Sequence, residues 1–491
     1  MRFTNFSRLA NAALVLGLVA SSCTSTTSDS IGQANRSPDV GSDSTVDRSE
    51  IDGDGEIEPD VAEVAEPNRD IDYLFDQAKL HTFELDLTEA DLAEIDGDPT
   101  AEEYVPGTLT FEGTTISVGI RYKGSVGAFV GCLDGPNVFL PSGAKTCTKL
   151  SMKIKINWEN GNDEFLGVRK LQFHTMNLDP SQLRERLGYW LFREMGVPSP
   201  RSTHARVVVN DEFVGLFALT ENIDGRFTRA NFGNGTGNLY KEAWPLTPAG
   251  RPQPPAVLLD SLRTNEDENP SAKRMLDFAT EVAEAGDPET TAEVVERWMD
   301  VETLMAQLAV DRTIRHDDGP FHWYCVGDCT PHNFFFYEDP VQDRVHLIPW
   351  DIDNAFENLG AQPNPVTPVA NAFGEITAEC RPFAFGALQI LQRSAACDPL
   401  FAAWATLDTE FEDAVKRLHE GPLRAEVVDP LLDTWIAQIQ EATVEASLNN
   451  DDAISVELWK AAIADLRDQL DKTRQEPPIV VQPLSAETGG S

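Results

Sequence analysis

The sequence predicts an α+β protein in which a strand-rich first half is followed by a helix-rich second half. Alternating apolar and polar residues, the pattern of half-buried strands, are concentrated before about residue 225. Apolar residues at helical spacing dominate from about residue 226 onward. Because 491 residues are too many for one small core, we expect two lobes with a cleft between them.

Two hairpins and one further strand are expected in the first half. Residues 108–122 predict a hairpin that turns at Glu112-Gly113, and residues 207–219 predict one that turns at Asn210-Asp211. Residues 149–157 alternate strictly between apolar and polar side chains, so one face of this strand is buried. The other face carries lysines and is expected to lie over the cleft.

A well-marked helix is expected between Asp179 and Met195. Asp179 can cap this helix, Pro180 suits its first turn, and Gln182 completes the spacing of a capping box. Gly196 is expected to end it. Further helical patterns cover residues 270–286, 288–316, 399–419, 425–448 and about 454–473.

The two ends of the chain are expected to lie outside the fold. Residues 1–22 combine a positive end with a short apolar run, which is typical of a bacterial lipoprotein signal peptide that leaves Cys23 lipidated. An ordinary cleaved signal peptide is the alternative. Residues 23–71 are acidic and have almost no aromatics, so they predict a disordered tether, and residues 476–491 predict a flexible tail.

These ends leave a folded body over residues 72–475. Its first lobe is expected over about 72–225 and its second lobe over about 226–475. A lipid at Cys23 would hold this body at the outer side of a membrane as part of the cell envelope. No other stretch is long and apolar enough to predict a transmembrane helix.

The charge of the chain excludes some partners. The sequence has 81 acidic and 39 basic residues, for a net charge of −42. Such a surface repels nucleic acid and anionic membranes, since both are bound through Lys and Arg. We therefore expect contact with a membrane only through the lipid anchor. The oligomeric state is not indicated by the sequence.

The cysteines indicate disulfides. Apart from Cys23 there are six, and an even number in an exported chain favours disulfide pairing. Pairing by neighbours is the simplest of the 15 possible connectivities. A zinc site is the rival interpretation, but the sequence contains no CxxC pair and no histidine at ligand spacing. The pairs of neighbours are Cys132–Cys147, Cys325–Cys329 and Cys380–Cys397.

Residues 311–356 carry the strongest indication of chemistry. Asp318 follows a predicted helix, Asn333 precedes an apolar strand, and Asp351 follows the next strand. The three side chains thus stand at the ends of adjacent elements, where loops can converge. Carboxylate and amide oxygens suit Mg²⁺ or Mn²⁺, and protein kinases use an Asp, an Asn and an Asp in this order. A structural cluster of loop residues is the alternative.

The sequence resembles the spore-coat CotH family of atypical kinases in at least six segments in matching order. They span about 240 residues, and NxxxYxDP followed by PWDxD is the most specific pattern. The matching segments are RYKGS (121–125), KLSMKIKIN (149–157), LRERLGYWLFREMGVPSPR (183–201), GLFALTENID (215–224), GNLYK (237–241), and HDDGP, HNFFFYEDP and LIPWDIDNAF within 316–356.

The resemblance implies a reduced, kinase-like fold that uses ATP with Mg²⁺ or Mn²⁺. Carried over by position, it makes Asp318 the catalytic aspartate and Asp351 a metal ligand, and the kinase order suggests Asn333 as a second metal ligand. Lys153 is the chosen phosphate lysine because it lies mid-strand, although Lys149 and Lys155 share its face.

The remaining candidates for ATP binding lie on neighbouring elements. Glu185, on the capped helix, is the expected ion-pair partner of Lys153, and pairing with a neighbouring arginine is the alternative. Arg121, Lys123 and Ser125 are expected to cover the phosphates.

Three departures from kinase patterns stand out. The residue before Asp318 is Asp317, where the family often has an aromatic, so either aspartate can be the catalytic one. Neither a GxGxxG loop nor a P-loop is present. Asn333 lies 15 residues beyond Asp318, whereas in an ordinary kinase the Asn lies five residues beyond the catalytic Asp.

The leading hypothesis is an extracytoplasmic kinase that transfers the ATP γ-phosphoryl group to Ser or Thr of surface or secreted proteins. ATP is scarce outside the cytoplasm, so a non-catalytic protein of adhesion or envelope assembly is the second hypothesis. A metal-dependent enzyme acting on cell-wall polymers is the third. Binding of Mg-ATP distinguishes the first from the others.

Overall fold

The computed structural model describes residues 70–137, 140–159, 164–266, 270–316, 318–356, 380–385 and 390–475. Several predictions concern residues outside these ranges. They are the signal peptide, the lipidated Cys23, the tether up to residue 69, the choice between Asp317 and Asp318, and the flexible tail.

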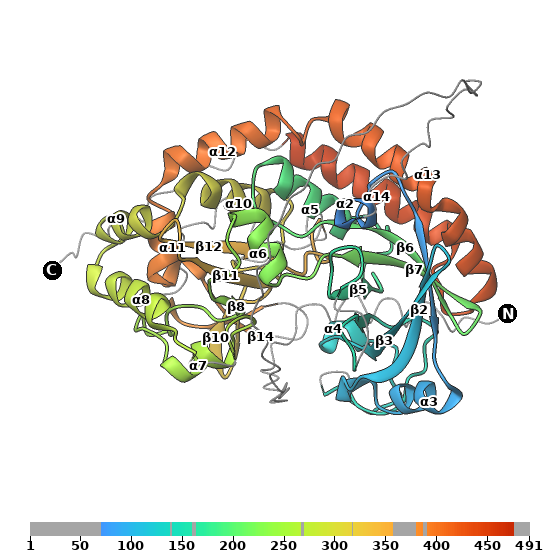
Figure 1. Cartoon of the computed structure of the whole chain (residues 1–491). Helices are drawn as coiled ribbons and strands as arrows, with labels where there is room; N and C mark the ends of the chain where they lie inside the picture. The colour runs from blue at the N-terminus through green and yellow to red at the C-terminus, as the bar shows by residue number, and fades with distance from the viewer. Residues whose placement is uncertain are drawn as a thin grey trace, which may run out of the picture.

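Seven strands of the first half close into a barrel, in the order β1-β2-β3-β4-β5-β7-β6 (Figure 1). Strands β1 and β6 close it with a parallel pairing, and every other neighbouring pair is antiparallel. Apolar side chains from all seven strands fill its interior. The strands are β1 (His81–Asp86), β2 (Val105–Phe111), β3 (Thr114–Tyr122), β4 (Met152–Lys155), β5 (Lys170–His174), β6 (Ser202–Val209) and β7 (Glu212–Thr220).

Both predicted hairpins are confirmed. The turn between β2 and β3 has positive φ at Glu112 (47°) and Gly113 (79°), and the turn between β6 and β7 has positive φ at Asn210 (49°) and Asp211 (66°). Two consecutive left-handed residues match the right-handed twist of the flanking strands. Local turn chemistry therefore sets the register next to both turns, although the pairing of β6 with β7 shifts between Val207 and Val208.

The alternating strand predicted over residues 149–157 is confirmed only over Met152–Lys155, which form β4. In β4 the side chains of Met152 and Ile154 are buried in the barrel, while those of Lys153 and Lys155 point outward and are partly exposed. Three short helices, α2 (Ile71–Leu74), α3 (Glu89–Gly97) and α4 (Val126–Phe129), lie at the ends of the barrel strands.

Helix α5 (Arg184–Glu194) begins later than the sequence predicts. Gln182 has a φ of 62°, which is incompatible with a right-handed helix, so Pro180 and Gln182 lie outside it. Asp179 still caps the helix from a distance, because its Oδ2 accepts a hydrogen bond from the backbone N–H of Arg184 at 2.8 Å. The expected capping box is therefore wrong in register.

The second half is mainly helical, as predicted, but two of the expected helices are each divided in two. Asp300 caps a new helix within 288–316, and residues 399–419 break after Trp404. The helices are α6 (Gly225–Phe232), α7 (Pro255–Asp260), α8 (Lys273–Ala285), α9 (Pro288–Trp298), α10 (Val301–Thr313), α11 (Pro399–Trp404), α12 (Asp408–Glu420), α13 (Ala425–Asn449) and α14 (Val456–Gln475).

Two small sheets lie among these helices. One has the order β12-β11-β8 and the other β10-β9-β14-β13. Their strands are β8 (Leu239–Lys241), β9 (Trp323–Val326), β10 (Asp328–Thr330), β11 (Phe334–Asp339), β12 (Arg344–Pro349), β13 (Phe383–Phe385) and β14 (Ile390–Arg393). The predicted apolar strands before Asp351 are β11 and β12, which pair as a hairpin.

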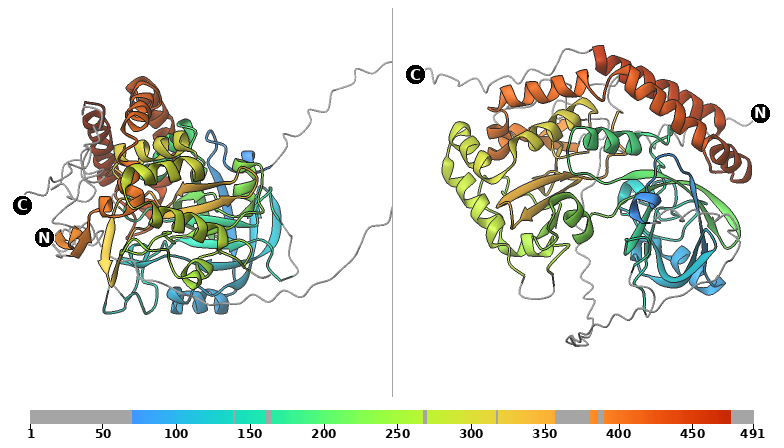
Figure 2. Two further views of the ribbon diagram at one scale, coloured as in Figure 1. Left: turned by 90° about the vertical axis from the view of Figure 1, so that its left-hand side faces the viewer. Right: turned by 45° about the horizontal axis from the view of Figure 1, so that its top comes forward.

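The barrel and the helices with the small sheets lie side by side (Figure 1). Helices α13 and α14 extend over the barrel, where α13 contacts β7, and α5 lies between the two parts (Figure 2). The fold class is α+β, as the sequence predicts. Among the described residues, no helix is long and apolar enough to cross a membrane.

All three predicted disulfides are confirmed, namely Cys132–Cys147, Cys325–Cys329 and Cys380–Cys397. Three disulfides are typical of proteins that fold outside the cytoplasm.

Removing either of the two disulfides with the shorter loops is expected to lower the unfolding free energy, and the longer loop is expected to cost more. The Cys132–Cys147 pair spans 15 residues, so its replacement by alanines is expected to cost about 3 kcal/mol of unfolding free energy. The Cys325–Cys329 pair spans four residues, which predicts about 2 kcal/mol. Urea unfolding of the two double variants measures both values. A larger loss for the shorter loop would contradict the loop-entropy account.

Candidate active site

Asp318 and Asn333 meet although 15 residues separate them. The amide Nδ2 of Asn333 donates to Oδ2 of Asp318 at 2.7 Å and to its backbone oxygen at 3.0 Å. Asn333 is buried just before β11 and has a φ of 58°. The left-handed conformation turns its amide back toward the loop that carries Asp318, which Asn tolerates better than most residues.

Asp351 lies next to this pair because β12 ends beside the start of β11. The backbone N–H of Trp350 donates to the backbone oxygen of Asn333 at 3.2 Å. Asp351 has a φ of 52°, and its backbone is held on both sides. Its N–H donates to the Tyr189 hydroxyl at 3.0 Å, and its oxygen accepts from Nε2 of His316 at 2.9 Å. The structure thus brings Asp318, Asn333 and Asp351 together, as the sequence predicts.

His316 is a buried residue that supports this arrangement. Its Nδ1 lies 3.1 Å from Oδ2 of Asp311, so both ring nitrogens face acceptors and both must carry hydrogen. Burial opposes the charge, but Asp311 outweighs burial and raises the pKa of His316. A Cβ at Gly319 would lie 2.4 Å from Nδ1 of His316, so this position requires glycine.

Carboxylates are in excess on this side of the site. Burial and the charge of Asp351 raise the pKa of Asp318 to about 7, although His316 opposes the shift. Burial and then the charges of Asp351, Glu185 and Asp318 raise the pKa of Asp353 well above its usual range. Neighbouring carboxylates that raise one another's pKa are the environment that a cation relieves. The donor set therefore fits a divalent metal.

Asn333 and Asp351 are the residues that would hold such a metal. Within the described ranges, no group of three or more His, Cys, Asp or Glu side chains is placed to hold a metal ion by itself. Two protein ligands suit Mg²⁺, which often completes its coordination with water and substrate phosphate.

The expected ion pair between Glu185 and Lys153 is not formed. Glu185 instead reaches Lys123 through His174. Its Oε1 lies 2.8 Å from Nδ1 of His174, and Nε2 of His174 lies 2.7 Å from Nζ of Lys123. Because a carboxylate only accepts, Nδ1 carries the hydrogen and Nε2 accepts from the lysine. The Thr220 hydroxyl also donates to Glu185, at 2.6 Å. The predicted Lys153–Glu185 pair is therefore replaced by a buried chain ending at Lys123.

Lys153 lies instead in a cluster of cations, which we call the basic cluster: Arg121, Lys123, Lys153, Lys170 and Lys241. Burial and then the charges of the other four lower the pKa of Lys153 well below its usual value. Among the described residues, none forms a hydrogen bond or ion pair with the Lys153 ammonium group. The Lys153 ammonium group therefore has no anionic partner among the described residues, and a phosphate chain would supply one.

The other candidates for phosphate binding have different surroundings. Arg121 forms an ion pair with Glu102, so its charge is already compensated. Ser125 is exposed, and its side chain does not cap α4. Lys149 is turned away from the basic cluster, because its Nζ donates to the backbone oxygen of Leu216 at 2.7 Å. Of the lysines in the matching segments 121–125 and 149–157, Lys123 and Lys153 thus lie in the basic cluster, whereas Lys149 does not.

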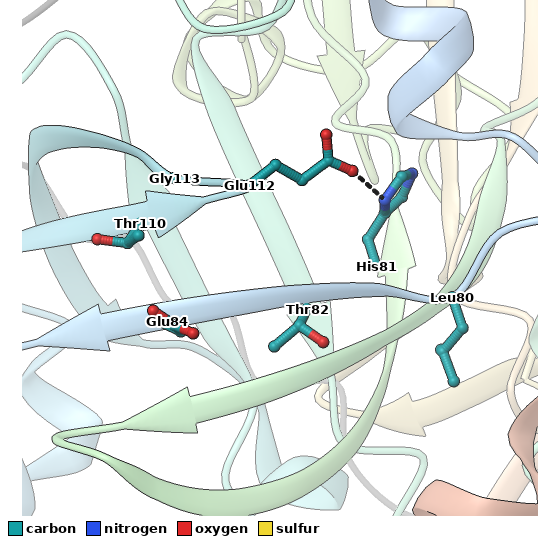
Figure 3. A pocket seen from close by; sticks show the side chains of 7 residues that line it. All are labelled: Leu80, His81, Thr82, Glu84, Thr110, Glu112 and Gly113. Atoms are coloured by element: carbon teal, nitrogen blue, oxygen red, sulfur yellow. Dashed lines mark ion pairs between the residues drawn. The ribbon is translucent and has the colours of Figure 1, made fainter.

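A separate pocket of about 310 Å³ lies on the barrel at the start of β1 (Figure 3). Two of its polar groups pair with each other, since Glu112 lies 3.6 Å from Nδ1 of His81, and Glu112 also accepts from the Tyr73 hydroxyl at 2.6 Å. None of the predicted site residues lines it. The lining residues are Leu80, His81, Thr82, Glu84, Thr110, Glu112 and Gly113.

The family model described as CotH kinase protein matches residues 120–475. This chain belongs to the CotH kinase family. The match begins within β3 and extends through α14, so it contains every residue of the candidate site, whereas β1 and β2 of the barrel lie outside it. A comparison with curated proteins finds no match.

Sequence reasoning missed several residues of this CotH site. Lys241 and His316 stand within the GNLYK and HDDGP segments, and Tyr189 lies within the α5 segment, but none was chosen. His174 and Thr220 each end an apolar strand, and a polar residue at that position is a weak signal. Their roles depend on contacts between β5, β7 and α5 that no single segment specifies.

Proposed function

We propose that this CotH family member is an extracytoplasmic protein kinase. It transfers the γ-phosphoryl group of ATP, with Mg²⁺ or Mn²⁺, to Ser or Thr hydroxyls of surface or secreted proteins. The barrel and the helical half act as the two lobes of a kinase-like fold, and ATP lies between them. A lipid on Cys23 holds the protein at the cell envelope.

The observation that carries this proposal is that a group of carboxylates adjoins a group of cations at the site. Asp318, Asp351 and Asp353 interact electrostatically with one another, and the members of the basic cluster surround Lys153. Nζ of Lys123 lies 5.6 Å from the centre of the Trp350 ring, next to Asp351. Lys123 lies within electrostatic range of both Asp351 and Lys241, so it stands at the boundary. Mg-ATP has the matching pattern, because its metal needs carboxylates and its phosphates need cations.

The chemistry follows from these positions. The oxygen of the acceptor hydroxyl attacks the γ-phosphorus, and the bond from that phosphorus to the β,γ-bridging oxygen breaks, so ADP leaves with the electron pair. Asp318 accepts the proton of the hydroxyl. Lys123, fixed by His174 and Glu185, and Lys153 neutralise the phosphates. A divalent metal would be held by Asp351 and Asn333 and would further neutralise the phosphate oxygens.

Phosphate transfer from labelled ATP by the full chain tests the proposal. The protein should be exported during production so that its disulfides form, and Mg²⁺ and Mn²⁺ should be compared. Label on a generic protein acceptor or on the chain itself is the expected result. A folded protein that neither binds ATP nor transfers phosphate would favour the alternative of a non-catalytic adhesion or envelope-assembly protein.

The pH dependence of kcat/KM is expected to show a midpoint near 7. Asp318 can accept a proton only when ionised, and its pKa is about 7. Activity therefore rises with pH through this midpoint and falls about tenfold per unit below it. The neighbouring Tyr324 hydroxyl lowers the pKa of Asp318, so Tyr324→Phe is expected to move the midpoint upward. An unchanged midpoint in this variant would contradict the assignment.

A further inference from the structure

Helix α5 provides two contacts to the site from one side. Glu185 holds His174 and, through it, Lys123. The hydroxyl of Tyr189, four residues later, accepts the backbone N–H of Asp351 at 3.0 Å. Residues four apart lie on the same side of a helix. A shift of α5 would therefore displace the phosphate lysine and the metal aspartate together.

Arg186, between these two contacts, is buried, with 1% of its surface exposed. Its Nε donates to Oε1 of Gln77 at 2.9 Å, and its Nη2 donates to the backbone oxygen of Gln77 at 2.7 Å. Its Nη1 lies 2.8 Å from both Nδ1 of His204 and Oε1 of Gln438. The ring of Trp435 lies 4.2 Å from its guanidinium carbon. Arg186 thus joins α5 to β6, to α13 and to the segment before β1.

All of these hydrogen-bond acceptors are neutral. Burial lowers the pKa of Arg186 to about 9, which leaves it charged at neutral pH. A buried charge without an opposite charge is costly, and an apolar side chain of similar volume is often no less stabilising. An apolar side chain forms no directional hydrogen bonds, however, whereas a guanidinium has five N–H donors in one rigid plane. The network is therefore suited to fixing the position of α5 more than to adding stability.

The C-terminal pair of helices, α13 and α14, also holds the segment in front of α5. The Thr443 hydroxyl of α13 donates to Oε1 of Gln182 at 2.8 Å. Nε1 of Trp459, on α14, donates to the backbone oxygen of Ser181 at 3.1 Å. Figure 2 shows this helical pair running past α5 and over the barrel. Contacts from residues 425–475 thus reach both the start and the first turns of α5.

We infer that Arg186 is a positioning residue that fixes α5 against α13, and that the C-terminal helical pair thereby aligns Glu185 and Tyr189 with the active site. The inference rests on the proposed function, because the site it concerns is the proposed kinase site. It gives residues 425–475 a role in catalysis although none of them is among the proposed catalytic residues. The alignment of the site then depends on the end of the chain.

The variant Arg186→Met in the full chain tests this role, with Arg206→Met as the matched control. Arg206, on β6, pairs with Glu445 of α13 at 2.7 Å, so the control removes an arginine contact to the same helix without involving α5. Arg186→Met is expected to lower kcat by roughly tenfold or more, through misplacement of the reacting groups. The Kd for Mg-ATP is expected to rise as well, because Lys123 and Asp351 are displaced with α5. Arg206→Met is expected to change kcat and Kd by less than about twofold.

Hydrogen–deuterium exchange gives a readout that does not depend on ATP. Peptides from residues 184–194 are expected to exchange faster in Arg186→Met than in Arg206→Met. If Arg186→Met does not fold, Gln438→Met removes one acceptor on α13 and is expected to change kcat and exchange in the same directions by less.

Equal effects of the two arginine variants on kcat and on exchange would overturn the inference. The inference would also be overturned if Arg186→Met lowered the melting temperature but left kcat and exchange in α5 unchanged. A wild-type chain that neither binds nor uses ATP would overturn the proposed function instead, and exchange in α5 would then decide the inference alone.

Discussion

Asp318→Asn is expected to lower kcat for phosphate transfer by about 10²- to 10⁴-fold, because asparagine cannot accept the proton of the acceptor hydroxyl. The replacement has nearly the same size and can still meet the amide of Asn333, so the loop is expected to stay in place. The Kd for Mg-ATP is expected to change little. Transfer of labelled phosphate and calorimetric ATP binding measure the two quantities.

Asp398→Asn is the matched control for this variant. Burial raises the pKa of Asp398 to about 7 as well, but this carboxylate caps α11 and accepts from Nε1 of Trp244 at 3.0 Å. Its replacement is expected to leave kcat within about twofold of wild type, since it touches no reacting group. If Asp318→Asn keeps full activity while Asp398→Asn does not, the assignment of the catalytic aspartate is wrong.

Lys153→Met is expected to weaken Mg-ATP binding by about 10- to 150-fold, the range for one hydrogen bond between charged groups. The same variant is expected to raise the unfolding free energy of the protein without ATP by about 1 kcal/mol, because it removes a partly buried cation from among other cations. These opposite signs distinguish a binding residue from a structural one. Calorimetry and urea unfolding measure them.

Lys149→Met, four residues earlier and outside β4, provides the contrast. Nζ of Lys149 donates to the oxygen of Leu216, so its loss is expected to cost about 1 to 3 kcal/mol of unfolding free energy. Binding of Mg-ATP should be unchanged, because Lys149 lies outside the basic cluster. A Lys153→Met protein that is less stable and binds ATP normally would exclude Lys153 as a phosphate ligand.

The elements that the sequence predicted correctly depend on neighbours along the chain. The turns at Glu112-Gly113 and Asn210-Asp211 follow from residues that tolerate positive φ. The strand β4 follows from strict alternation, and the three disulfides join cysteines at most 17 residues apart. Where residues in contact are also close in the sequence, local patterns are sufficient to predict the structure.

The start of α5 shows where a local pattern fails. Asp179, Pro180 and Gln182 form a complete capping signal, yet Gln182 is left-handed and its side chain accepts from Thr443 of α13. A contact from more than 250 residues away competes with the capping box and replaces it. Tertiary contacts can override a local preference, because that preference is worth only about 1 kcal/mol.

By itself, the sequence determined the α+β class, the CotH resemblance, and the residues Asp318, Asn333 and Asp351 that the structure brings together. Only the tertiary structure decided that Glu185 reaches Lys123 through His174, and that Lys149 is turned away from the basic cluster. The physical reason is that the alternation of a strand predicts only the face on which a lysine lies. The partner of that lysine depends on which elements pack against this face. Those elements, β5, β7 and α5, are separated in the chain and meet only when the barrel closes.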